Sequence, residues 1–360
     1  MHPTEQLLIT ERMAHDFNII KDCLAFNNTI AIIIYGGYGR DEGSWIFDSP
    51  TQCRPYNDYD ILLISKEKIL SQRLSSIGEE IKQAIGIRWI DLGCKTIPDL
   101  QKMQPSIYNY DLKYASKVIY GDMNFRDFIP SMDSSTLPLR EIETLYFTRL
   151  WTLLGSIDEN GFSTDSCDGE KVRFFRNQMA KAILAIVDVR LLQIGKYHYS
   201  YNERVKRVCE YDSQNKTLVE MSKWALAEKL CPQASSMTKE EIQKLYNKVH
   251  QIYFEEMFKG LSKYYKSKIE NTIHIERKLK WSPLNLMKRI GWLILRQNND
   301  RENSISLKVA QSYIACAHSA NYNDYMQRGI KAIKKIDPNF SEDSTWDEAR
   351  LKIASLRLSQ

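Results

Sequence analysis

Two stretches near the N-terminus decide the fold of this chain: residues 32–40, IIIYGGYGR, and residues 57–64, NDYDILLI. The first is an apolar run that ends in a glycine turn, and the second is an apolar run that opens with Asp58 and Asp60. Side chains alternate between the two faces of a strand, so both carboxylates are expected to point toward one place. Two carboxylates held that close repel each other, and a divalent cation relieves the repulsion. Because glycines also let a phosphate approach the backbone, these features indicate metal-assisted chemistry on a nucleotide.

This arrangement resembles the DNA polymerase β-like nucleotidyltransferase superfamily. The signature of that superfamily is a hydrophobic strand, a Gly-Gly or Gly-Ser turn, an Asp-x-Asp on the next strand and a third carboxylate on a later strand. The matching residues here are Gly36, Gly37, Asp58, Asp60 and, within residues 87–92, Asp91. The resemblance covers roughly the first third of the chain.

The sequence departs from the pattern of the superfamily in the length of one connection. The gap between Gly37 and Asp58 is longer than is usual in the superfamily. Residues 44–56 contain Pro50 and Pro55, and we expect this segment to be an inserted loop.

The resemblance implies a Mg²⁺- or Mn²⁺-dependent enzyme that transfers a nucleoside monophosphate from an NTP to an acceptor hydroxyl and releases pyrophosphate. It implies that Asp58 and Asp60 hold the metal ions, and that Asp91 completes the shell of one ion and serves as a base. It also implies a set of phosphate contacts. These are Gly36, Gly37, Arg40, Ser44 and Lys181.

Lys181 belongs to a helical pattern later in the chain. Arg173, Asn177 and Lys181 are spaced four residues apart, so they share one face of a helix. In antibiotic and cyclic-nucleotide-forming nucleotidyltransferases, a helix of the second domain closes over the triphosphate and contributes a lysine, and the resemblance assigns that role to Lys181. An ordinary surface lysine is the alternative, just as a solvated helix start is for Arg40 and a turn-capping aspartate is for Asp91.

The predicted fold class is α+β, with a small mixed β-sheet nucleotidyltransferase domain over residues 1–135 and an all-helical domain over residues 136–360. Alternating or fully apolar runs predict strands, and a period of 3.6 predicts helices. The predicted strands are 30–35, 60–65, 87–94 and 114–120. The main predicted helices are 5–26, 66–85, 139–154, 172–195, 216–230, 239–265 and 307–335, and polar loops are expected at 156–170 and 297–304.

Composition limits the class of protein. The chain has 360 residues, 43% of them hydrophobic and 26% charged, which is typical of globular domains. A net charge of +5 suits an anionic ligand such as an NTP but is low for a protein that coats nucleic acid. The seven scattered cysteines, the lack of a signal-peptide pattern and the short apolar runs predict a cytoplasmic protein with no membrane span.

The acceptor of the transfer stays open in the sequence: a small molecule, a second nucleotide or a protein side chain would each fit, and a nucleic-acid end is less favoured. Residues 277–289 are basic with interleaved aromatic and aliphatic residues. This stretch is expected either to bind RNA or an anionic membrane surface, or to pack as an amphipathic helix with a solvated basic face. The alternative to an enzyme is a catalytically weak nucleotide-binding regulator or partner subunit that keeps the fold.

Overall fold

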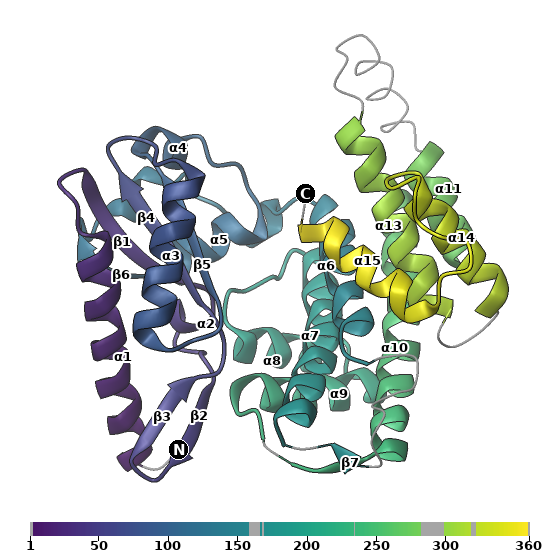
Figure 1. The fold of residues 1–360 in the computed structure, drawn as a ribbon, viewed down its shortest axis with the longest axis horizontal. Helices are drawn as coiled ribbons and strands as arrows, with labels where there is room; N and C mark the ends of the chain where they lie inside the picture. The colour runs from purple at the N-terminus through teal and green to yellow at the C-terminus, as the bar shows by residue number, and fades with distance from the viewer. Residues whose placement is uncertain are drawn as a thin grey trace. The chain divides into compact units, whose positions relative to one another are not determined.

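The computed structural model describes residues 3–157, 166–167, 169–233, 235–281, 299–317 and 322–358 (Figure 1). The chain divides into two compact units. The first consists of Met1–Pro138, Leu191–Gln214 and Leu226–Pro232, and the second of Leu139–Arg190, Asn215–Ala225 and Gln233–Gln360. The division near residue 138 lies close to the expected boundary at 135, but two later segments belong to the first unit, where the sequence had suggested two contiguous domains.

The first unit is built on a four-stranded mixed sheet with the strand order β5-β4-β1-β6. Its strands are β1 (Thr29–Tyr35), β4 (Tyr59–Ser65), β5 (Ile90–Lys95) and β6 (Lys117–Gly121). β1 pairs antiparallel with both β4 and β6, whereas β4 and β5 are parallel. The two central strands are buried on both faces, which explains why they are continuous apolar runs and not alternating ones. The predicted small mixed sheet followed by helices is therefore confirmed at the level of an α+β fold.

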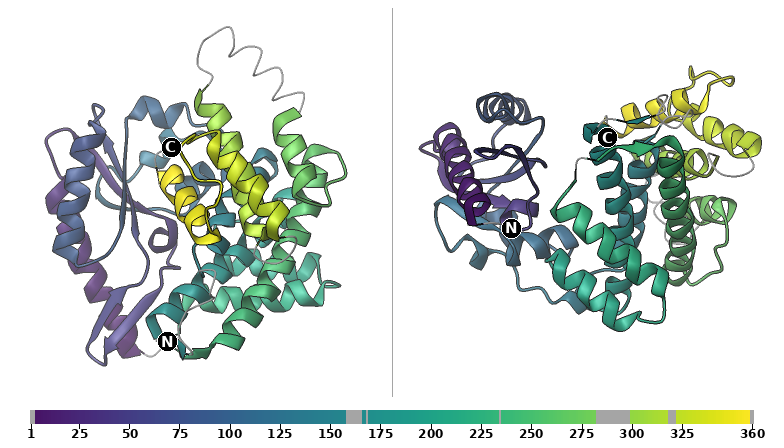
Figure 2. Two further views of the ribbon diagram at one scale, coloured as in Figure 1. Left: turned by 45° about the vertical axis from the view of Figure 1, so that its right-hand side comes forward. Right: turned by 90° about the horizontal axis from the view of Figure 1, so that it is seen from below.

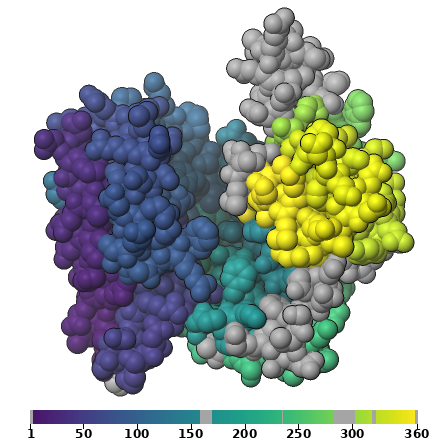
Figure 3. Space-filling model, in the orientation of Figure 1, coloured from purple at the N-terminus to yellow at the C-terminus, as the bar shows by residue number. Residues whose placement is uncertain are grey.

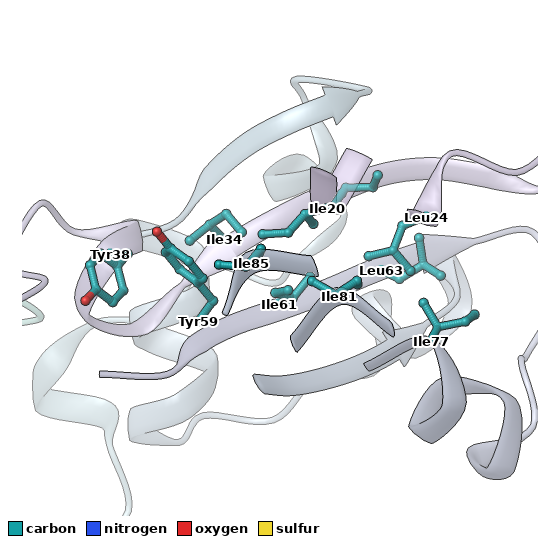
Figure 4. Close-up of a cluster of buried hydrophobic side chains, with 11 residues drawn as sticks. Ile20, Leu24, Ile34, Tyr38, Tyr59, Ile61, Leu63, Ile77, Ile81 and Ile85 are labelled. Atoms are coloured by element: carbon teal, nitrogen blue, oxygen red, sulfur yellow. The ribbon is translucent and has the colours of Figure 1, made fainter. Parts of the chain in front are cut away.

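Helices cover both faces of this sheet. On one face lie α1 (Pro3–Leu24) and α3 (Ser71–Ile85), which run side by side in Figures 1 and 2. Figure 4 shows the core between these helices and the sheet, where Ile20, Ile61 and Ile81 are fully buried. The other face packs on α4 (Ile97–Gln101), α5 (Ile107–Tyr114) and the 3-10 turn η1 (Phe125–Phe128). The sheet is thus a rigid middle layer that fixes the ends of β4 and β5.

The segment expected to be an inserted loop is a β-hairpin, so this prediction was wrong. It is formed by β2 (Trp45–Ser49) and β3 (Gln52–Pro55). Pro50 lies in the tight turn and Pro55 is the last residue of its strand, and a proline is tolerated in both places. Because β3 packs against α1, the extra residues form a side layer and leave the pairing of β1 with β4 intact.

The second unit is helical. Its long helices are α6 (Arg140–Leu154), α7 (Gly169–Gln193), α10 (Lys239–Tyr265), α11 (Thr272–Trp281), α13 (Asn299–Ala317), α14 (Tyr322–Lys334) and α15 (Trp346–Leu358), and α9 (Lys216–Leu230) is divided between the units. The two short strands β7 (Ser166–Cys167) and β8 (Met237–Thr238) pair with each other. Figure 3 shows α14 and α15 as a continuous yellow surface of this unit. None of the helices in the described ranges is long and apolar enough to cross a membrane.

Two predictions about the helical unit were wrong. Residues 299–304, expected in a loop, begin α13, and the single helix expected over 307–335 is two helices, α13 and α14, that pack against each other. Of the other expected loop, residues 158–165 lie outside the described residues, as do residues 282–289 of the basic stretch.

Buried polar contacts explain why two late segments belong to the first unit. The Glu42 carboxylate accepts hydrogen bonds from the backbone N–H groups of Tyr201 (2.8 Å) and Asn202 (3.1 Å), at the start of α8 (Tyr201–Tyr211). The buried Ser44 hydroxyl donates to the backbone carbonyl of Lys229. Glu42 therefore adds to the capping of α8 by Ser200, although it lies about 160 residues away in the sequence, and its charge suits the helix N-terminus.

We expect Glu42→Gln to lower the free energy of unfolding by ~1–3 kcal/mol, because buried donors lose a charged acceptor. Urea denaturation followed by circular dichroism would measure the change. The matched control is Asp41→Asn, which removes the same charge from a surface ion pair with Lys117 and is expected to change stability little. Equal effects of the two substitutions would show that Glu42 contributes no more than its exposed neighbour.

Candidate active site

Three aspartates meet where β4 and β5 begin. Asp60 and Asp91 are direct neighbours in the parallel register of the two strands, and Asp58 precedes β4 by one residue. Between Asp58 and Asp60 in the sequence lies Tyr59, which is fully buried in the core and donates a hydrogen bond of 2.9 Å to Asp16. Because strand side chains alternate, Asp58 and Asp60 lie on the face opposite Tyr59. Asp58 and Asp91 are exposed to solvent and Asp60 is half-buried, so the group opens to the outside.

The charges of these carboxylates influence one another. Burial, followed by the neighbouring charges of Asp58 and Asp91, raises the pKa of Asp60 to about 7. Partial desolvation and then the charge of Asp58 also raise the pKa of Asp91. The structure thus brings the three predicted aspartates into electrostatic contact, in an arrangement that favours binding of a proton or a cation.

The predicted glycine turn lies directly against Asp60. Gly36 follows β1, whose last residue, Tyr35, pairs with Asp60, and it adopts a left-handed backbone conformation with φ +64°. Gly36 and Gly37 begin the single helical turn α2 (Gly36–Gly39). A Cβ atom on Gly36 would lie 1.8 Å from Asp60 Oδ2. Both the backbone conformation and the close approach of the carboxylate therefore require glycine at this position.

Replacing Gly36 by alanine is expected to cost at least ~1–3 kcal/mol of stability and to displace the Asp60 carboxylate, because the new methyl group has no space. Thermal and urea unfolding would measure this. The control is Gly78→Ala within α3, where a Cβ would meet no atom within 4 Å and where stability should rise by ~0.5–1 kcal/mol. A neutral result for Gly36→Ala would mean that the carboxylate does not rest on this turn.

Arg40 and Ser44, which the resemblance assigned to the phosphates, make structural contacts. Arg40 Nη1 donates to Asp111 Oδ2 at 3.1 Å, and its guanidinium is stacked over the Tyr201 ring at 4.4 Å. Ser44 is fully buried, and its hydroxyl is engaged by the backbone of Lys229. This differs from the prediction for Ser44, because a buried hydroxyl with a backbone partner is not presented to a ligand. Arg40 acts on the site through its positive charge, which partly offsets the rise in the pKa of Asp60.

Arg40 belongs to a group of cations whose other members, Arg204 and Lys229, were not identified from the sequence. Around the ring of Tyr201 are Arg204 at 4.1 Å, Arg40 at 4.4 Å and Lys229 Nζ at 6.0 Å. Lys229 is buried, and its positive charge, like that of Arg40, partly offsets the rise in the pKa of Asp60. The site thus combines an acidic edge with a basic side. No sequence pattern marks Lys229, because it lies in an ordinary helical stretch more than 160 residues after Asp60.

Lys181 is half-buried on α7, in the second unit. On the same helix Arg173 and Asn177 are buried, so the predicted polar face is covered by other side chains instead of being exposed to solvent. The assignment of Lys181 as a phosphate ligand stays a prediction.

The aspartates suit a divalent cation in their chemistry. In the described parts of the chain, no group of three or more His, Cys, Asp or Glu side chains is arranged to hold a metal ion. Mg²⁺, however, is usually bound by one or two carboxylates and completes its shell with water and substrate phosphates. Asp60 with either neighbouring aspartate provides such hard oxygen donors, and the pKa of Asp60 is raised by burial and then by the charges of Asp58 and Asp91. The residues therefore fit an ion that binds together with a phosphate-bearing substrate.

No family model matches the chain, and no curated protein or solved structure matches it either. The case for a function therefore depends on the side chains described above.

Proposed function

We propose that this chain is a Mg²⁺- or Mn²⁺-dependent nucleotidyltransferase of the DNA polymerase β-like type. It transfers a nucleoside monophosphate from an NTP to an acceptor hydroxyl and releases pyrophosphate. The observation that carries the proposal is the position of Asp60, whose carboxylate lies against the Gly36 turn and is close enough to Asp58 and Asp91 for their negative charges to raise its pKa.

In the proposed transfer, one bond to the α-phosphorus forms as another breaks. The acceptor oxygen forms a bond to the α-phosphorus, the bond from that phosphorus to the bridging oxygen breaks, and pyrophosphate leaves. The proton of the acceptor hydroxyl passes to a carboxylate. Asp91 suits this role, because it is exposed and its raised pKa makes it a better proton acceptor than an ordinary aspartate. A bound divalent cation would neutralise phosphate charge and lower the pKa of the attacking hydroxyl.

Each group around Asp60 has a task in this proposal. Asp58 and Asp60 hold the cation, and the turn at Gly36 and Gly37 allows the phosphates to approach the backbone. The buried cations Arg40 and Lys229 keep Asp60 from acquiring an even higher pKa, so that it can ionise near neutral pH. They are positioning residues, since their contacts are with the protein.

The direct test is turnover of labelled substrate. Each of the four NTPs, labelled at the α-phosphate, is incubated with the full chain and Mg²⁺ or Mn²⁺, alone and with a cell lysate that supplies acceptors. The proposal expects a labelled product together with pyrophosphate, and addition of EDTA should abolish both. Binding of an NTP without turnover under any of these conditions would favour the nucleotide-binding regulator, and the absence of both binding and turnover would exclude the proposed function.

A further inference from the structure

A cavity with no part in the proposed transfer lies within the helical unit. It has a volume of about 780 Å³ and is lined by residues of α11, α13, α14 and the segment that continues to Glu342. The three helices pack side by side at one end of the unit (Figure 1). Cavities of roughly 300–1,000 Å³ are typical of small-molecule sites, so this one is large enough for a nucleotide-sized ligand.

The lining of the cavity is basic. Its described residues include five basic and three acidic side chains, a net charge of +2. Each acid is paired within the cavity with one of the cations. These pairs are Glu276 with Lys280, Asp324 with Arg328, and Glu342 with Lys334. The remaining positive charge is that of Lys331 and Lys335.

The excess charge is concentrated in one place. Lys331 lies in the last turn of α14 and Lys335 directly follows the end of that helix, and both line the cavity. Partial desolvation, followed by the neighbouring ammonium group of Lys280, lowers the pKa of Lys335. Two ammonium groups that face each other repel, and an anion placed between them removes this cost.

The rest of the lining favours a small organic ligand over a nucleic-acid strand. Val309, Ile330 and Ala332 form a buried apolar part of the wall. None of the described lining residues is aromatic, whereas proteins that bind single strands generally stack bases on aromatic rings. Residues 277–281, the described part of the basic stretch, contribute Lys280 to this cavity.

We propose that this cavity is a binding site for a phosphorylated small molecule, whose phosphate is held by Lys331 and Lys335 and whose organic part occupies the rest of the cavity. Lysine ammonium groups bind phosphate as point charges, without the fixed fork geometry of arginine. The site is independent of the aspartates at β4 and β5.

The test is isothermal titration calorimetry of the full chain in EDTA, with pyrophosphate, AMP and glucose 6-phosphate as probes. We expect at least one probe to bind, and Lys331→Gln combined with Lys335→Gln to weaken that binding by about tenfold or more, since two charged contacts are removed. AMP as the tighter organic probe would indicate a nucleotide ligand, and glucose 6-phosphate as the tighter one a sugar phosphate.

The matched control is Lys244→Gln with Lys248→Gln, two exposed lysines with the same spacing on α10. The control should retain the affinity, and so should Asp60→Asn, which separates this site from the proposed catalytic one. The proposal is overturned if no probe binds at about 10 mM, or if the control pair weakens binding as much as the pair in the cavity. It is also overturned if only a single-stranded RNA binds through Lys331 and Lys335, because the ligand would then be a nucleic acid.

Discussion

Asp60→Asn is expected to reduce nucleotidyl transfer by at least ~10²–10³-fold, the range seen when one electrostatic group of a preorganised site is removed. The substitution keeps the shape of the side chain but removes the charge that a divalent cation would need. It also leaves an amide against the Gly36 turn, where the carboxylate now lies. Steady-state rates of pyrophosphate release at saturating NTP and Mg²⁺ would measure the loss.

The stability of the same variant provides a second, independent result. Since burial and the charges of Asp58 and Asp91 disfavour the ionised form of Asp60, removing its charge should leave the protein as stable as the wild type, or more stable, above pH 7. An inactive but stable variant would place Asp60 in the chemistry. A variant that is inactive because it unfolds would give no evidence that Asp60 takes part in the chemistry.

Asp22→Asn is the control for this prediction, because Asp22 is exposed on α1 and carries the same charge. It should alter neither the rate nor the stability. If Asp60→Asn retains the wild-type rate, Asp60 cannot be a ligand of the catalytic ion, and the proposed function loses the observation that carries it.

The part of the site that sequence could predict is the part set by strand geometry. The period of two places Asp58 and Asp60 on one face, and an apolar strand that ends in Gly36 predicts a turn beside them. The structure has these features, and it adds that Asp60 is opposite Asp91 in the register. Such features depend on residues that are close in the sequence and on the pairing of strands, and short sequence patterns predict both.

Of the basic side of the site only Arg40 was identified from the sequence, because tertiary contacts alone bring Lys229 to Asp60. Glu42 reaches the start of α8, and Lys229 approaches Asp60 from a helix that appears ordinary in the sequence. The same applies to Ser44: its place after the glycine turn suggested a phosphate contact, and its burial against the backbone of Lys229 removes it from the surface.

Two predictions about the fold were wrong because the local sequence pattern is ambiguous at those places. The hairpin of β2 and β3 has prolines at its turn and at its end, and two prolines so close together are typical of a loop. In the helical unit, the apolar period of 3.6 continues from α13 into α14, so the pattern does not mark the place where one helix ends. In both cases packing against a partner, α1 or the neighbouring helix, decides the structure.

In the absence of divalent cations, the protein is expected to lose stability as the pH rises from about 4 to about 7, because Asp60 ionises at about pH 7 in the folded chain and near pH 3.8 when unfolded. Between these values the folded state binds more protons than the unfolded state, so raising the pH favours unfolding. The destabilisation is absent below the unfolded pKa and complete above the folded pKa. The raised pKa of Asp91 acts in the same direction.

The size of the effect makes it measurable. A shift from 3.8 to about 7 corresponds to roughly 4 kcal/mol as an upper bound, a large share of the ~5–15 kcal/mol that stabilises a typical domain. Urea denaturation in EDTA at a series of pH values from 4 to 8 would give the profile. In Asp60→Asn the decline should be reduced to the contribution of the remaining carboxylates.

Addition of Mg²⁺ with a non-hydrolysable NTP should reverse this profile. The ligated form requires ionised carboxylates, so binding strengthens as the pH rises through 7, and the stabilisation by ligand should be largest at pH 8. The two curves, with and without ligand, are therefore expected to diverge with increasing pH. If they stay parallel from pH 5 to pH 8, protons and cations do not compete for the same carboxylates. The raised pKa of Asp60 would then reflect burial alone and give no reason to place a metal ion beside the Gly36 turn.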